Sequence, residues 1–140
     1  MVYDSTRQVS ILFGGFSTAN LEDTWQWDGQ GCTQVADSGP IARNSHAMAF
    51  DTEREKTVLF GGSGPPRNNL PTRLGDTWEF DGQDWTQQAD TGPRPGRGHA
   101  MAFSSAGVRV LLLDGIAVKT WAWNGNWRGC SRYQNSPRRA

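Results

Sequence analysis

The stretch Arg43–Gly62, RNSHAMAFDTEREKTVLFGG, decides how the rest of the chain is interpreted. Its segment HAMAF, His46–Phe50, recurs letter for letter at His99–Phe103. Internal repetition has to be settled before any side chain is assigned a chemical role, because residues that recur with a repeat serve its scaffold first. The two histidines are therefore judged as members of a repeat.

Aligning the chain with itself gives three copies of one unit. The first copy contains MVYDSTRQVSILFGG and then EDTWQWDGQGCTQVADSGP, and the second contains MAFDTEREKTVLFGG and then GDTWEFDGQDWTQQADTGP. The third, MAFSSAGVRVLLLDG followed by KTWAWNGNWRGCSRY, has diverged most. We assign the copies to residues 1–40, 41–93 and 94–133, and residues 134–140 to a polar tail.

Each copy contains four runs with strand character. HAMAF alternates bulky and small side chains, a period of two that places the bulky groups on one face. TVLFGG, like SILFGG and RVLLLDG, is a continuous apolar run, typical of a strand covered on both faces. TWEF, TWQW or TWAW follows, then Asp-Gly or Asn-Gly as a strong hairpin signal, then a fourth run such as DWTQQ. The sequence predicts an all-β chain of about three four-stranded antiparallel sheets.

Sheets that are apolar on both faces need a neighbour on each face, so the three units are expected to stack radially as blades of a β-propeller. Propellers close with about four to eight blades, and three would leave the first and last sheets uncovered. We therefore predict an incomplete ring. The chain is either a segment of a longer protein, which we favour, or it pairs with a second copy as a homodimer that completes a six-bladed ring.

These motifs resemble the kelch repeat, in particular its bacterial form with an Asp-Gly hairpin, over nearly the whole chain. The resemblance implies a β-propeller with the architecture of the galactose oxidase central domain. In that family an arginine and a histidine precede the first strand, a glycine pair closes the second, an aromatic side chain lies in the third and a tryptophan opens the fourth. The matching structural residues are Gly14, Gly15, Trp25, Trp27, Arg43, His46, Gly61, Gly62, Trp78, Trp85, His99, Gly115, Trp121 and Trp127.

This chain departs from the family pattern in three places. Cys32 stands where the second copy has Trp85, and Asp114-Gly115 replaces the glycine pair of the third copy. The arginine that leads into the third copy is shifted to Arg97. The repeat signal is therefore weakest in the third copy.

The recurring side chains are expected to serve the architecture. His46 and His99 occupy one slot in successive copies, and we expect each to satisfy a backbone group where the chain enters its first strand. A copper site on the ring axis, as in galactose oxidase-like enzymes, is the alternative that the resemblance suggests, with Tyr3 and Tyr133 as the available tyrosines. The seven tryptophans are expected to pack between blades and not to present sugar-binding platforms. We predict no catalytic residues, no metal site, no cofactor and no enzymatic activity.

Binding is expected at one rim of the sheets. The segment between the glycine pair and the third run is longer in the second copy, SGPPRNNLPTRLG, and insertions in repeat proteins map to rim loops that bind ligands. The candidate binding residues are Arg67, Asn68, Asn69 and Arg73, and a solvated loop is the alternative. The resemblance implies a module that binds a protein or another macromolecule. The runners-up are the propeller domain of a carbohydrate-acting or metal-dependent enzyme with catalytic residues in further blades, and a structural module of a surface protein.

Charge and composition limit the classes of partner that the chain is expected to bind. The 14 basic and 14 acidic side chains are scattered along the sequence, so we do not expect the clustered basic surface that nucleic-acid binding needs. No run approaches the roughly 20 apolar residues of a membrane helix, and no signal-peptide pattern is visible. We expect neither nucleic acid nor a membrane as partner, and Cys32 and Cys130 leave the compartment unknown.

Overall fold

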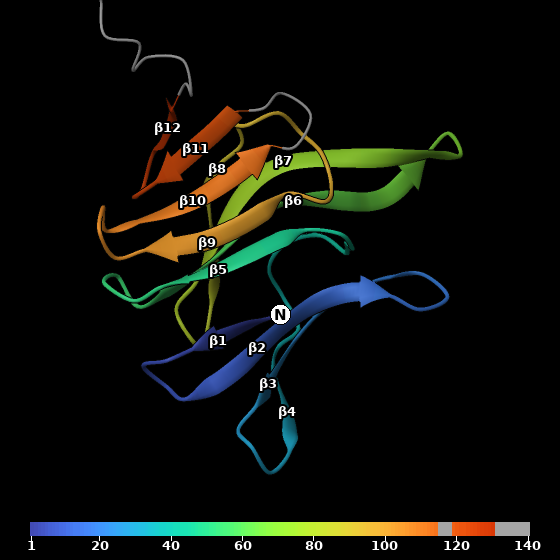
Figure 1. Cartoon of the computed structure of the whole chain (residues 1–140). Helices are drawn as coiled ribbons and strands as arrows, with labels where there is room; N and C mark the ends of the chain where they lie inside the picture. Colours follow the sequence, from blue (N-terminus) through green and yellow to red (C-terminus); the bar gives the residue numbers. More distant parts are fainter. Residues whose placement is uncertain (115–118, 131–140) are drawn as a thin grey trace, which may run out of the picture.

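The computed structural model describes residues 1–114 and 119–130, where every regular element is a β-strand. Twelve strands in these residues form three four-stranded antiparallel sheets, and the strands of each sheet pair in chain order (Figure 1). The predicted all-β fold with blade-like sheets is thus confirmed. No helix in the described ranges is long and apolar enough to cross a membrane. Gly115 and the tail 134–140 lie outside the described residues.

The three sheets are named blades 1 to 3 in chain order. Blade 1 contains β1 (Val2–Asp4), β2 (Val9–Phe16), β3 (Asn20–Trp27) and β4 (Cys32–Ala36). Blade 2 contains β5 (Ala47–Asp51), β6 (Lys56–Arg67), β7 (Leu70–Phe80) and β8 (Trp85–Ala89). Blade 3 contains β9 (Ala100–Ser104), β10 (Arg109–Asp114), β11 (Lys119–Trp123) and β12 (Trp127–Cys130).

The blades pack against each other face to face, and their first strands β1, β5 and β9 are neighbours along one side of the stack (Figure 1). Between blades 1 and 2, Val9 and Ile11 pack against Phe80. Between blades 2 and 3, Val58 packs against Trp123. The core therefore consists of two interfaces between sheets, as radial stacking requires.

The middle blade shows why its second strand is a continuous apolar run. Val58, Leu59 and Phe60 in β6 have no exposed surface, which confirms the prediction of a strand covered on both faces. In the matching run of β2, Ile11 is buried but Leu12 is 44% exposed. Because neighbouring side chains in a strand point to opposite faces, blade 1 is covered on one face and open on the other.

The ring is open at both ends, which corrects the prediction that every tryptophan packs between blades. Trp27 is 45% exposed, whereas its counterpart Trp123 is fully buried against blade 2. Cys32, which stands in the slot that holds Trp85 in the second copy, is also exposed. At the other end of the stack Leu113 is 38% exposed, while its counterpart Phe60 is buried. The reason is common to all three exposed residues: among the described residues, no blade lies before blade 1 or after blade 3.

The indoles that open β8 and β12 link neighbouring blades by hydrogen bonds inside these apolar interfaces. The Nε1 of Trp85 donates to Thr24 Oγ1 of blade 1 at 2.9 Å, and the Nε1 of Trp127 donates to Thr77 Oγ1 of blade 2 at 2.7 Å. A buried indole N–H needs such an acceptor. The repeated threonine before the third-strand tryptophan is therefore explained by the blade that follows it.

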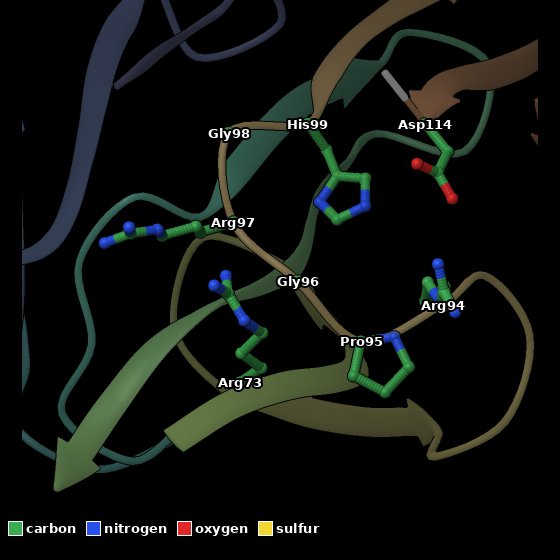
Figure 2. A pocket seen from close by; sticks show the side chains of 8 residues that line it. All are labelled: Arg73, Arg94, Pro95, Gly96, Arg97, Gly98, His99 and Asp114. Carbon is green, nitrogen blue, oxygen red and sulfur yellow. The ribbon is translucent and has the colours of Figure 1, made fainter. Parts of the chain in front are cut away.

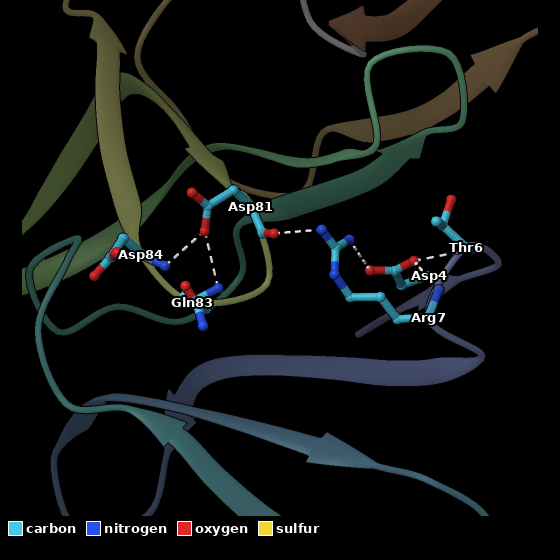
Figure 3. Close-up of polar contacts among 6 residues, drawn as sticks. All are labelled: Asp4, Thr6, Arg7, Asp81, Gln83 and Asp84. Carbon is cyan, nitrogen blue, oxygen red and sulfur yellow. Dashed lines mark hydrogen bonds and ion pairs between the residues drawn. The ribbon is translucent and has the colours of Figure 1, made fainter.

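The stack has two rims. The turn rim carries the tight turns after the first and third strands of each blade, and Figure 3 shows how its polar groups are satisfied within it. The Oδ1 atoms of Asp4 and Asp81 each accept hydrogen bonds from the backbone N–H groups two and three residues further on. Arg7 pairs with Asp4 at 2.7 Å and also donates to the backbone carbonyl of Asp81, which ties blade 1 to blade 2.

Candidate binding surface

The opposite rim, here called the hairpin rim, carries the β2–β3 and β6–β7 connections and the links between blades. The segment predicted to be a loop in the second copy is instead a β-hairpin arm, because the pairing of β6 and β7 continues beyond the rest of blade 2 (Figure 1). Arg67 pairs with Leu70, and Asn68 and Asn69 form the two-residue turn with φ values of 51° and 60°. Asparagine tolerates the positive φ that such hairpin turns require.

The four predicted binding residues are all exposed, but they do not lie together. Arg67, Asn68 and Asn69 form the tip of the arm. Arg73 lies further along β7, beside the link into blade 3 (Figure 2). Their role in binding stays a prediction, and the structure divides them between two places on one rim.

Each glycine pair of blades 1 and 2 receives the link that leads into the next blade. Gly15 N–H donates to the carbonyl of Arg43 at 2.9 Å, and Gly62 N–H donates to the carbonyl of Gly96 at 2.8 Å. Gly14 has a φ of +57°, and a Cβ on it would lie 2.6 Å from the Arg43 oxygen. A side chain would not fit there. The repeated contacts also show that Gly96 occupies the position of Arg43.

Arg43 is a structural arginine. Its guanidinium is fully buried and donates to both carboxylate oxygens of Asp76, at 2.7 and 2.8 Å, and to the carbonyl of Gly61 at 2.9 Å. Burial by itself raises the pKa of Asp76, but the hydrogen bonds and charge of Arg43, together with the indole N–H of Trp78, outweigh it and hold that pKa below its ordinary value. The arginine therefore fastens the link to blade 2.

The two histidines also serve the packing, although not through the hydrogen bond that was expected. The ring of His46 meets Phe13 edge-on at 5.6 Å, and that of His99 meets Phe60 at 5.1 Å. Within the described part of the chain, the buried Nδ1 atoms of both rings have no hydrogen-bond partner. Burial, with the positive N-terminus and Arg43 as smaller causes, lowers the pKa of His46 to about 4. His46 is therefore neutral at pH 7.

We expect the neutral state of His46 to make stability depend on pH between about 6.5 and 4. A histidine whose folded pKa lies below its unfolded value of about 6.5 contributes fully above pH 6.5 and loses that contribution as the pH falls. From pH 7 to pH 4 the free energy of unfolding should drop by about 2 to 3 kcal/mol from this group. Urea unfolding at pH 7, 5.5 and 4 measures the drop, and His46→Asn should flatten it. Equal slopes in the two proteins would refute the assignment.

Among the described residues, a hollow opens on the hairpin rim at each of the two junctions between blades. The apolar hollow, about 310 Å³ between blades 1 and 2, is lined mainly by Phe16, Ala42, Pro65 and Pro66. The arginine pocket, about 300 Å³ between blades 2 and 3, surrounds the link at Gly96 (Figure 2), and its polar side chains are Arg73, Arg94, Arg97, His99 and Asp114. Burial lowers the pKa of His99, and the charge of Asp114 partly opposes this.

The described residues contain no group of three or more His, Cys, Asp or Glu side chains placed to hold a metal ion. Tyr3 lies on the open face of blade 1, and Tyr133 lies outside the described residues. No family model and no curated protein matches this chain.

The sequence did not predict Arg94 or the apolar hollow as part of a binding surface, and it marked Asp114 only as a departure from the glycine pair. The repeat nevertheless contained a sign of the arginine pocket. In the second link the arginine, Arg97, comes one residue later than Arg43 does in the first link, relative to the carbonyl that accepts from the glycine pair. A shifted arginine implies that the buried position holds something else, here Gly96. That His99 reaches this position and that a pocket remains around the link follow only from the packing of the link.

Proposed function

We propose that this chain is a kelch-like β-propeller module that binds a protein or another macromolecule through its hairpin rim. The observation that carries the proposal is the difference between the two rims. The turn rim ends in short turns whose aspartates bond their own backbone. The hairpin rim carries the arm and both hollows. Ligand sites are typically built from irregular connections on a rigid scaffold.

The composition of the hairpin rim suits a macromolecular surface. Phe16 is 68% exposed beside Pro65 and Pro66, and the polar tip of the arm lies next to them. An apolar centre with a polar margin is the usual anatomy of a protein interface, and aromatic side chains dominate its energy. The type of repeat is proposed from the motifs of the sequence, and the three stacked four-stranded sheets support it.

Affinity enrichment with three forms of the full chain tests this function. Phe16→Ala combined with Arg67→Ala changes the hairpin rim, and Gln30→Ala combined with Gln83→Ala is a matched change of exposed side chains on the turn rim. We expect the wild type and the turn-rim variant to retain the same partner, and the hairpin-rim variant to lose at least about tenfold in affinity. A partner retained equally by all three forms would reject the hairpin rim as the binding surface.

We also propose that, when this chain is on its own and not part of a longer protein, the open faces of blades 1 and 3 cover each other in a homodimer of two copies. The exposed side chains on the first face include Leu12 and Trp27, and those on the last face include Leu113. The equivalent side chains are buried at the junctions within the chain. We therefore expect the same contacts between blade 3 of one copy and blade 1 of the other. Each face has an area on the order of 300 Å². The two junctions of the dimer bury four such faces, and their total area reaches the lower range of stable protein interfaces.

We expect sedimentation equilibrium of the wild type at tens of micromolar to give twice the chain mass of 15.5 kDa. Leu12→Glu places a charge on the open face and should give a folded monomer, since an unpaired charge is costly in an apolar interface. Thr86→Glu adds the same charge at an exposed position of β8 and should leave the dimer intact. A wild type that stays monomeric over the whole range would exclude the six-bladed homodimer.

A further inference from the structure

The arginine pocket exists because two junctions with the same backbone differ in their side chains. At the first junction the side chain of Arg43 fills the space behind the link. At the second junction Gly96 has no side chain, and a Cβ on it would lie 2.9 Å from His99 Cε1, so the His99 ring takes part of that space and a pocket remains around the link. The strand registers place Lys119 where blade 2 has Asp76, so neither member of the buried ion pair has a counterpart. Lys119 Nζ instead lies 4.3 Å from the ring centroid of Trp121.

The residues that flank the link differ as well. At the first junction Asn44 Nδ2 donates to Asn20 Oδ1 at 2.5 Å. At the second junction the same two positions hold Arg97 and Arg73, and Figure 2 shows their side chains on the same side of the link. Two asparagines satisfy each other, but two guanidinium groups only donate and repel each other. An anion that accepts from both would resolve this arrangement.

Arg94 brings a third cation to the pocket, in the position that Ile41 holds at the first junction. No ion pair or hydrogen bond joins the side chains of Arg73, Arg94 or Arg97 to another residue within 1–114 and 119–130. Asp114 supplies the carboxylate among the described lining residues. Three guanidinium groups against one carboxylate leave the pocket with an excess of positive charge.

We propose that the arginine pocket binds an oxyanion, a phosphate or carboxylate group carried by the ligand of the hairpin rim. Guanidinium forks match the oxygen pairs of both groups and form charge-assisted hydrogen bonds with them. A volume of about 300 Å³ admits such a group together with the part of the ligand that carries it. The inference rests on the proposed function for the carrier, whereas the anion site depends on the pocket residues.

Titration of the isotope-labelled full chain with inorganic phosphate, and separately with glutarate, tests the site by amide resonances. Ionic strength is held constant with sodium chloride, because screening changes exposed charges without binding. We expect saturable shifts at residues 94–99 with a Kd of about 1 mM, and none with chloride. Tighter binding of phosphate would point to a phosphorylated ligand, and tighter binding of glutarate would point to an acidic side chain.

The double variant Arg73→Asn with Arg97→Asn installs the asparagine pair of the first junction, so the fold should be kept. Loss of two charge-assisted donors should weaken binding of both anions by about 10- to 100-fold. Arg128→Asn, an exposed arginine of β12, should bind like the wild type. Absence of saturable shifts with both anions, or full binding by the double variant, would overturn the anion site. Neither result would affect the enrichment test with the Phe16 and Arg67 changes.

Discussion

Replacing Arg43 by methionine should lower the free energy of unfolding by about 3 to 5 kcal/mol. The guanidinium is fully buried and donates two hydrogen bonds to Asp76 and one each to the carbonyls of Gly61 and Ile41, and methionine supplies none of them. Removing one member of a buried pair leaves the other charge without compensation. Urea unfolding of the full chain at pH 7, followed by circular dichroism and tryptophan fluorescence, measures the loss.

The matched control is Arg97→Met, at an exposed arginine one position further along the equivalent link. Its free energy of unfolding should change by less than about 0.5 kcal/mol. A second measurement varies the pH. Because the pKa of Asp76 is lowered in the folded protein, its contribution to the free energy of unfolding is present above about pH 4 and is lost below it. Wild type should therefore lose this contribution below pH 4, while Arg43→Met should not. Equal stability of Arg43→Met and Arg97→Met would contradict the assigned role.

The parts of the fold that the sequence predicted are those in which every copy experiences the same surroundings. The apolar run of β6 and the glycine pair Gly61-Gly62 occur inside the stack, where local pattern and tertiary contact agree. Trp27 repeats the letters of a buried slot, but a repeat does not state whether a neighbouring blade is present. The arm was not predicted either, because Pro65, Pro66 and Pro71 argue against a strand. In the structure a register shift between Gly64 and Arg67 accommodates the prolines.

The candidate site was predictable as a rim and not as a pocket. The insertion drew attention to Arg73, because Arg73 lies in the longer segment between the glycine pair and the third strand-like run of the second copy. The other half of the pocket comes from Arg94 and Asp114, which are distant from Arg73 in sequence and meet it through the link into blade 3. Which side chain is missing matters as much as which is present, and only the backbone contacts of Gly96 reveal that it replaces Arg43.

Trp123→Ala should lower the free energy of unfolding by about 3 to 5 kcal/mol, the usual cost of deleting a large buried aromatic side chain. Trp123 is fully buried against Ala49 and Val58 of blade 2, so its removal leaves a cavity at the centre of an interface between blades. Its Nε1 also donates to Glu79 Oε1 at 2.8 Å. Glu79 keeps its ion pair with Arg54, and the cavity is therefore the main cause of the loss. Urea unfolding at protein concentrations too low for self-association measures this loss of stability.

Trp27→Ala is the matched control that the repeat provides, because Trp27 holds the same slot in blade 1 with an open face in front of it. In the dilute monomer it should cost less than about 1 kcal/mol. At concentrations where two copies cover each other's open faces, Trp27→Ala should also weaken self-association, so its cost in free energy of unfolding should grow with protein concentration. The cost of Trp123→Ala should already be complete in the dilute monomer. If both variants lost equal stability at high dilution, burial between blades would not be what separates these two tryptophans.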